Sequence, residues 1–269
     1  MILMSEYIFS IHEIVEYIFE SLDLQSQLHF ISCNKFLRYT YSHLIRINDK
    51  LLDDNDIKKK FFNNCTSCYL SSKLKKYPIC LKRVCLTYKF NDSIKDFPDY
   101  ITHLTLNDRF DRPISNLPVN ITHLTFGDRF NQPINDLPGN ITHLTFGDRF
   151  NQPINNPPGN ITHLTFGWIF NQPINNLPRN ITHLTFGDYF NQPINDLPVN
   201  ITHLTFGICF NQPINNLPSN ITHLTFGNCF NQPINGLPGT ITHLTFYKQF
   251  DKFVLEDVPK SVIHLKFLY

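Results

Sequence analysis

The chain has 269 residues, of which 42% are hydrophobic, enough for an elongated folded domain with a smaller one attached. Its formal net charge of +1 gives no global electrostatic support for a nucleic-acid partner. No stretch approaches the ~18 continuous apolar residues of a membrane span, and the first ten residues lack the basic segment of a secretory signal.

Residues 10–46 are predicted to form short helices, because their apolar residues recur at the i, i+3, i+4, i+7 spacing of an amphipathic helix. The first apolar set runs from Ile11 to Leu22 and ends at Asp23. A second set begins at Leu24. So short a helical segment buries too little surface to be stable alone, so residues 1–48 are predicted to dock on another surface.

The string IHEIVEYIFESLDLQSQLHFISCNKFLR, residues 11–38, resembles the F-box, a motif that binds the Skp adaptor of cullin–RING ubiquitin ligases. The matching residues are Glu13, Ile14, Ile18, Phe19, Leu22, Asp23, Leu28, Cys33 and Lys35. The usual early proline is absent, and Phe36 replaces the usual tryptophan. The resemblance implies an apolar surface that enters a groove of the adaptor. That surface would consist of Ile14, Ile18, Phe19, Leu22, Leu24 and Leu28.

The alternative interpretation of residues 1–48 is an amphipathic cap for the repeats that follow, since terminal repeats require a polar outer cover. A cap needs apolar periodicity, but it does not need the break at Leu22-Asp23 or the Cys33-Asn34-Lys35 sequence. These two features favour the F-box interpretation.

Residues 49–80 are polar and rich in lysine, and we interpret them as a linker with one or two short helices and an N-terminal cap. Cys65, Cys68 and Cys80, together with Cys85, could supply thiolates to a zinc ion. However, their spacing matches no common zinc module, and Cys85 aligns with an outward position of the repeats. Incidental reduced thiols are the alternative, and no metal site is predicted.

Residues 81–269 are organised by a 20-residue motif, written ITHLTFGDRFNQPINNPPGN at 141–160, and each copy is called a rung below. Rungs start at Ile101, Ile121, Ile141, Ile161, Ile181, Ile201, Ile221 and Ile241. Diverged copies begin at Leu81 and, after a one-residue insertion, near Val262. A fixed period of this length is the signature of a solenoid, and the sequence predicts ten strands, one for each copy.

Within the rung at 121–140, Leu124 and Phe126 share one face of a strand, which is predicted to pack into the core. The side chains between them lie on the opposite, open face. Ile121 has the wrong parity for the core face and is predicted to turn inward before the strand. Pro133 and Pro138 exclude a helix from the return segment. The apolar positions of the rung are Ile121, Leu124, Phe126, Phe130, Ile134 and Leu137.

This pattern resembles the FNIP repeat, named for residues such as Phe130-Asn131 with Ile134 and a proline, and the resemblance covers residues 81–267. FNIP repeats are short relatives of leucine-rich repeats, whose L-x-x-L-x-L core matches I-T-H-L-T-F. An F-box followed by FNIP repeats is similar to a family of amoebae and of the giant viruses that infect them. The resemblance implies a small all-α F-box-like domain followed by a leucine-rich-repeat-like β-solenoid with one parallel sheet.

Three polar rows are expected along the solenoid, because each recurs once per rung. The histidines from His103 to His264 should stack on the open face, either as a metal array or as a ladder of neutral rings. The lack of carboxylates and thiols among them favours the neutral ladder, whose crowding should lower its proton affinity. The threonines that start at Thr105 suit a strand and resemble ice-binding solenoids by analogy only. The asparagines from Asn131 to Asn231 are predicted to bond loop backbone.

The two positions after each strand-ending glycine vary most between rungs, and they should lie at the rim of the open face. A charged set at 108–149 is followed by an apolar set at 168–209, a pattern that indicates a partner-binding surface. The alternative is neutral drift in a recently duplicated array. The candidate substrate-binding residues are Arg129, Arg149, Trp168, Ile169, Tyr189 and Ile208.

No nucleophile and base stand apart from the repeats, and no nucleotide-binding or zinc-protease motif occurs, so neither catalysis nor a cofactor is predicted. The leading hypothesis is a substrate-recognition adaptor of a Skp–cullin–F-box ubiquitin ligase, which holds the Skp adaptor through residues 1–48 and an unidentified protein substrate through the solenoid. The alternative is an interaction scaffold whose N-terminal helices serve only as a cap.

A cytoplasmic location, in the host if the protein is viral, is expected from the repeated Asn-Ile-Thr sequences. Each is an acceptor pattern for N-glycosylation, and strands ~4.8 Å apart would crowd a glycan on every rung. No membrane or nucleic-acid partner is expected.

Overall fold

The computed structural model describes residues 67–70, 72–74, 77, 81–87, 90, 93–247 and 255–268. The chain divides into two compact units, Met1–Asp92 and Ser93–Tyr269. The expected F-box-like domain, residues 1–48, lies outside the described residues, as does the first part of the expected linker.

The described part of the first unit contains a parallel pair of strands, β1 (Ser67–Leu70) and β2 (Arg83–Leu86). The expectation of a strand near residue 81 is confirmed by β2. Strand β1 lies within residues 49–80, the expected linker and N-terminal cap, and was not among the ten predicted strands. Cys68 and Leu70 alternate there with exposed residues and are 4% and 0% exposed, so a short apolar alternation forms a strand where the repeat motif is missing.

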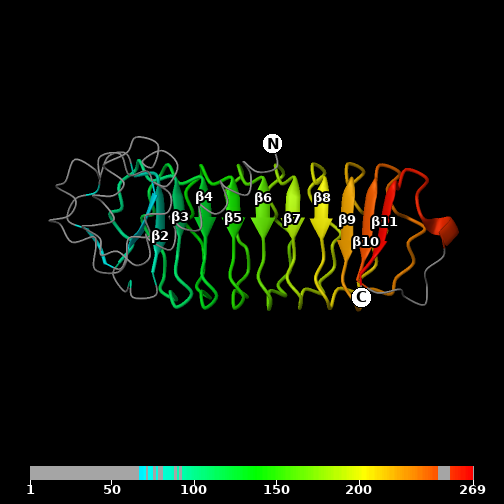
Figure 1. Cartoon of the computed structure of the whole chain (residues 1–269), viewed down its shortest axis with the longest axis horizontal. Helices are drawn as coiled ribbons and strands as arrows, with labels where there is room; N and C mark the ends of the chain where they lie inside the picture. Colours follow the sequence, from blue (N-terminus) through cyan, green and yellow to red (C-terminus); the bar gives the residue numbers. More distant parts are fainter. Residues whose placement is uncertain are drawn as a thin grey trace, which may run out of the picture. The chain divides into compact units, whose positions relative to one another are not determined.

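The second unit is a parallel β-solenoid in which the strands follow one another in sequence order, as the row of arrows in Figure 1 shows. Its strands are β3 (His103–Thr105), β4 (His123–Thr125), β5 (His143–Thr145), β6 (His163–Thr165), β7 (His183–Thr185), β8 (His203–Thr205), β9 (His223–Phe226), β10 (His243–Phe246) and β11 (His264–Phe267). Nine predicted strands are thereby confirmed in this unit.

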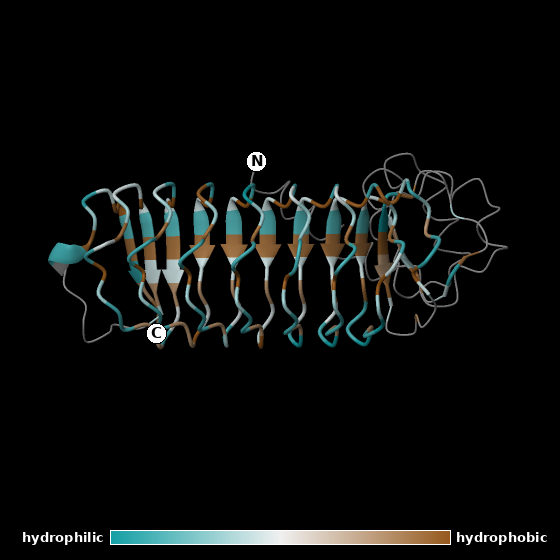
Figure 2. Ribbon diagram, turned by 180° about the vertical axis from the view of Figure 1, so that it is seen from behind, coloured by the Kyte–Doolittle hydropathy of each residue, from teal (hydrophilic) through white to brown (hydrophobic). Residues whose placement is uncertain are grey.

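The register within the second unit places each residue on its equivalent in the next rung. His123 pairs with His143, and Leu124 pairs with Leu144. The one-residue insertion before the last strand is also confirmed, because His243 pairs with His264. Residues of one kind therefore lie in rows across the strands, and the ribbon in Figure 2 shows matching hydrophilic and hydrophobic colours from strand to strand.

The core of the solenoid contains two stacked rows of phenylalanine beside rows of isoleucine and leucine. Phe166 and Phe170, from the same rung, have ring centroids 3.8 Å apart, and both are at most 2% exposed. Along the array, Phe166 lies 5.6 Å from Phe186, and Phe170 lies 6.1 Å from Phe190. Aromatic side chains bury ~150–250 Å² each, so these rows contribute a large part of the apolar burial in the rungs that carry both phenylalanines.

The segments between strands have the predicted extended and turn-like form, and residues 93–247 contain no helix. Ile121 turns inward as expected: its side chain is 0% exposed, and its N–H donates to the carbonyl oxygen of Pro118 at 3.2 Å. Of the predicted apolar positions in that rung, Leu137 is only half-buried. The short 3-10 helix η3 (Leu255–Asp257) precedes β11.

Candidate functional site

The variable positions of each rung lie at a rim that has the same backbone in every rung. The second rim residue donates its N–H to the carbonyl oxygen of the first rim residue in the preceding rung, as Tyr189 does to Trp168 at 2.9 Å. The bonds from Arg129 through Cys229 measure 2.7–3.0 Å. Because only main-chain atoms make this contact, the rim side chains can vary without disturbing the stack.

A glycine precedes the rim in most rungs because the main chain of the preceding rung lies against it. A Cβ atom at Gly187 would overlap the carbonyl oxygen of Gly167, and no φ angle is positive at any described glycine. The requirement is therefore space for a neighbouring main chain. The glycines in this position are Gly127, Gly147, Gly167, Gly187, Gly207 and Gly227.

The structure brings the predicted apolar rim residues together as an exposed cluster on successive rungs. The exposed fractions are 51% for Trp168, 38% for Ile169, 52% for Tyr189 and 44% for Ile208. The rings of Trp168 and Tyr189 lie 6.1 Å apart at an interplanar angle of 55°. Large aromatic side chains exposed in one cluster are typical of binding hot spots. We call these four residues the apolar rim.

The neighbouring charged rim carries aspartate and arginine in two parallel columns. Arg129 and Arg149 are exposed, as predicted. Burial, followed by the like charges of Asp108 and Asp148, raises the pKa of Asp128. The charged and apolar sets are thus consecutive segments of one rim, with Asp148 and Arg149 on the rung before Trp168 and Ile169.

The predicted histidine ladder is present on the open face. Neighbouring rings from His103 to His264 have centroids 4.0–4.4 Å apart and are nearly parallel for most of the array. Each ring nitrogen Nδ1 from His103 to His243 lies 2.8–2.9 Å from the hydroxyl of the threonine before it. Burial, followed by neighbouring histidine charges, lowers the pKa values of His143, His183 and His203.

The asparagine row has the predicted structural role. Asn171 Oδ1 accepts hydrogen bonds from the Asn191 backbone N–H at 3.0 Å and from Gln192 Nε2 at 3.1 Å. Asp111 replaces asparagine at the start of the row and accepts the equivalent bond from Asn131 at 2.9 Å. A side-chain oxygen at this position therefore links each rung to the next from Asp111 to Asn211, whereas Asn231 Oδ1 is buried without a hydrogen-bond partner among the described residues.

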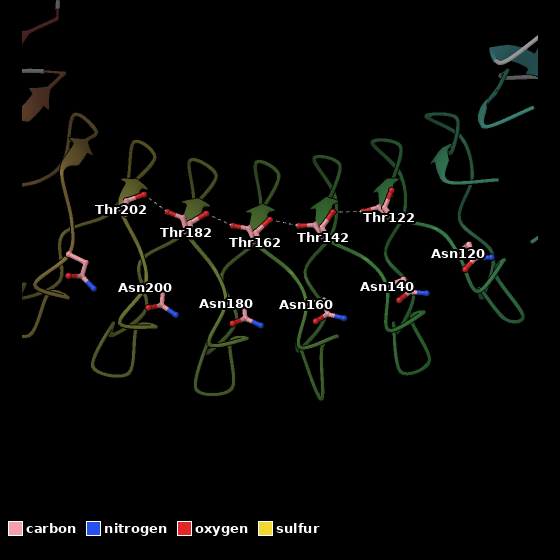
Figure 3. A pocket seen from close by; sticks show the side chains of 11 residues that line it. Asn120, Thr122, Asn140, Thr142, Asn160, Thr162, Asn180, Thr182, Asn200 and Thr202 are labelled. Carbon is pink, nitrogen blue, oxygen red and sulfur yellow. Dashed lines mark hydrogen bonds between the residues drawn. The ribbon is translucent and has the colours of Figure 1, made fainter. Parts of the chain in front are cut away.

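A polar groove of about 1060 Å³ runs along the rungs and was not recognised from the sequence (Figure 3). Thr142 Oγ1 lies 3.1 Å from the carbonyl oxygen of Thr122, and Asn140 Nδ2 donates to the carbonyl oxygen of Val119 at 2.9 Å. The lining residues carry no charge, so the groove offers hydrogen bonds but no acid–base group. They are Asn120, Thr122, Asn140, Thr142, Asn160, Thr162, Asn180, Thr182, Asn200, Thr202 and Asn220.

The signal for this groove was the Asn-Ile-Thr sequence itself. Its isoleucine faces the core, as Ile141 does with 0% exposure, so the residues on either side face outward together. The pattern was considered only as an acceptor for N-glycosylation. Hydrogen bonds from these asparagines and threonines to the preceding rung were therefore not predicted.

The remaining candidate sites lie wholly or partly outside the described residues. In the described part of the chain, no group of three or more histidine, cysteine, aspartate or glutamate side chains is placed to hold a metal ion. Of the four cysteines considered for zinc, Cys65 and Cys80 lie outside the described residues, and Cys68 pairs with Val84 rather than with Cys85. The predicted adaptor-binding residues from Ile14 to Leu28 also lie outside the described part.

Comparison with protein families identifies the repeats. The model of the FNIP Repeat family matches residues 114–136, 134–157, 170–196, 190–229 and 230–269, which together make up more than half of the chain. No curated protein matches the chain. None of the helices among the described residues has the length and apolar character needed to cross a membrane.

A solved structure has a similar sequence and fold. CroV588 is a giant-virus protein whose crystal structure is described as a novel circular LRR protein structure. Its sequence is 43% identical to this chain, and the two structures match with a TM-score of 0.69. The match covers 76% of this chain and 34% of that one. The chain therefore spans about a third of the length of that relative.

Proposed function

Because the chain belongs to the FNIP repeat family, we propose that it is a non-catalytic interaction protein whose solenoid binds a protein partner through the rim. Leucine-rich-repeat-like solenoids are typical of interaction proteins, since stacked repeats present extended surfaces. The observation that carries the proposal is the apolar rim, where Trp168 and Tyr189 are each about half exposed on neighbouring rungs.

The rim suits recognition because its main chain is fixed in every rung while its side chains are free to vary. The main chain is held by repeated N–H···O bonds such as Cys209 to Asp188 at 2.7 Å, whereas the side chains differ from rung to rung. A rigid backbone that carries aromatic side chains loses little conformational entropy on binding. The adjacent arginines Arg129 and Arg149 would provide charged contacts at the edge of the same surface.

Replacing Trp168 and Tyr189 by serine is expected to weaken partner capture about tenfold or more, because hot-spot aromatics supply most of the binding energy. Tagged wild-type and variant chains would be compared by quantitative mass spectrometry after capture from the same lysate. Val199→Ser is the matched control, since Val199 is 68% exposed but lies away from the rim. Equal capture by all three chains, or equal loss in the control, would contradict a binding role for the apolar rim.

We further propose that this interaction protein is a substrate receptor of a Skp–cullin–F-box ubiquitin ligase. The proposal is supported by the F-box-like sequence of residues 11–38 followed by FNIP repeats. Residues 1–48 would hold the Skp adaptor, and the solenoid would hold the substrate near the ubiquitin-conjugating enzyme. The catalysis would belong to the other subunits, and this chain would supply proximity.

Purified Skp adaptor is expected to bind the full chain, and the double variant Ile18→Asp, Leu22→Asp should abolish that binding. Both substitutions put a charge into the predicted apolar contact, where it would lose its hydration without a partner. The Trp168→Ser, Tyr189→Ser variant should bind Skp normally. Absence of Skp binding by the wild-type chain, or binding that survives both aspartates, would reduce the proposal to an interaction scaffold with an N-terminal cap.

A further inference from the structure

Two cysteines occupy the same rim position on consecutive rungs. Cys209 follows β8, and Cys229 follows β9. The backbone N–H groups of Cys209 and Cys229 bond to Asp188 at 2.7 Å and to Ile208 at 2.9 Å, so both residues have the same main-chain setting. On the same two rungs, the rings of His203 and His223 lie 4.1 Å apart.

We propose that Cys209 and Cys229 form a reversible disulfide that links two consecutive rungs at the rim. Both cysteines lie in turns after their strands, where the Cys229 N–H donates to the carbonyl oxygen of Ile208, the residue before Cys209, so the two main chains are in contact at this position. Rungs that stack at the ~4.8 Å spacing of parallel strands fall within the Cα separation of about 4.4–6.8 Å that a disulfide spans. The two side chains leave the main chain at equivalent positions and project from the same rim. Cys229 is exposed and Cys209 is half-buried, so a reagent in solution can reach the pair.

The two thiols have different roles in the exchange. Burial, followed by the neighbouring Cys229 and Asp188, raises the pKa of the Cys209 thiol, and a hydrogen bond to Cys229 raises it further. The thiolate is the nucleophile in thiol–disulfide exchange, so the exposed Cys229 is the thiol that attacks the oxidant first. Cys209 then acts as the resolving thiol.

The chemistry balances with a low-molecular-weight disulfide as the oxidant. The Cys229 thiolate attacks one sulfur of glutathione disulfide, the S–S bond breaks, and one glutathione leaves and takes up a proton. Cys209 then loses its proton and attacks the Cys229 sulfur of the mixed disulfide, which expels the second glutathione as a thiol. Two cysteine thiols are oxidised, and one glutathione disulfide is reduced to two glutathiones.

The bond would act on the surface proposed to bind a partner, because Ile208 of the apolar rim precedes Cys209 directly. Linking consecutive rungs closes one turn of the solenoid covalently. The disulfide would therefore restrict local opening of that turn, and a reductant would reverse the effect. The existence of the bond does not depend on the identity of any partner.

The test is to incubate the native full-length chain with glutathione disulfide, block remaining thiols with an alkylating reagent and digest with trypsin. No lysine or arginine lies between Arg179 and Lys248, so Cys209 and Cys229 fall in one peptide, 180–248. The expected product is that peptide without alkyl or glutathione groups and lighter by two hydrogens. Reduction before alkylation should restore two alkylated cysteines.

Matched variants distinguish the disulfide from general thiol oxidation. Cys209→Ser should leave Cys229 as a lasting glutathione adduct, whereas Cys68→Ser should leave the cross-link unchanged, since Cys68 is buried on β1. Unfolding in urea before oxidation should reduce the yield of the 209–229 link several-fold. A wild-type peptide that carries two alkyl groups, or a persistent glutathione adduct, would overturn the proposal.

Discussion

A single methyl group added at Gly187 should destabilise the centre of the solenoid by about 3 kcal/mol or more. In Gly187→Ala the new Cβ would overlap the carbonyl oxygen of Gly167 and approach the backbone nitrogen of Trp168 at 2.9 Å. These are main-chain atoms of a stacked rung, so no side-chain rotation can relieve the overlap. The two rungs would have to separate, which breaks the bond from Tyr189 to Trp168.

Urea unfolding followed by the fluorescence of Trp168, the single tryptophan, would measure this loss at the rung concerned. Gly159→Ala is the matched control, because a Cβ there meets nothing within 4 Å and its φ angle is not positive. The control should change stability by less than about 1 kcal/mol and is expected to stabilise, since alanine restricts the unfolded chain. Equal unfolding midpoints for the two alanine variants would show that the rungs do not pack as described.

Acidification between about pH 7.5 and 5.5 should lower the melting temperature of the solenoid through the histidine ladder. The pKa values of His143, His183 and His203 are lowered from 6.5 in the folded chain, so the unfolded chain binds protons first as the pH falls. Stability is therefore complete above about pH 6.5 and decreases from there towards the lower folded pKa values. Rings stacked 4.1–4.2 Å apart cannot all become charged without mutual repulsion.

Replacing alternate histidines isolates this repulsion. In the variant His143→Gln, His183→Gln, His223→Gln, His163 and His203 lose both neighbouring histidines, whereas His123 and His243 keep one each, His103 and His264. On acidification, the melting temperature of this variant should fall less than that of the wild-type chain. The difference should exceed the share of the removed histidines, because the repulsion between neighbouring rings is also removed. A melting temperature of the wild-type chain that stays constant between about pH 7.5 and 5.5 would contradict the predicted effect of the histidine ladder.

Most of the second unit could be predicted because one 20-residue pattern specifies it many times. Leu124 and Phe126 identify the buried face by their alternation, and Pro133 rules out a helix in the return segment. Strand β1 was missed because Ser67–Leu70 carries only a four-residue alternation, without the histidine, glycine or proline that marks a rung. Short apolar runs of that kind do not distinguish strands from other elements.

The candidate site was predictable in position but not in its contacts. Variation between rungs located Trp168 and Tyr189 at the rim, and their exposure followed from the glycine that ends each buried segment. The groove lined by residues such as Asn140 and Thr142 depends on hydrogen bonds between rungs. Those bonds are set by side-chain rotamers and by the offset of successive turns, and periodicity in the sequence records neither.

The uniform stacking of the rungs has a consequence for how such a chain can change in evolution. Each rung presents matching surfaces to the rungs before and after it, with histidine on histidine and phenylalanine on phenylalanine. Recombination between two copies that removes or adds one 20-residue unit between Ile121 and Thr240 would therefore rejoin compatible surfaces. The array can then lengthen or shorten without a new core, and each event also moves the rim residues by one rung relative to any partner.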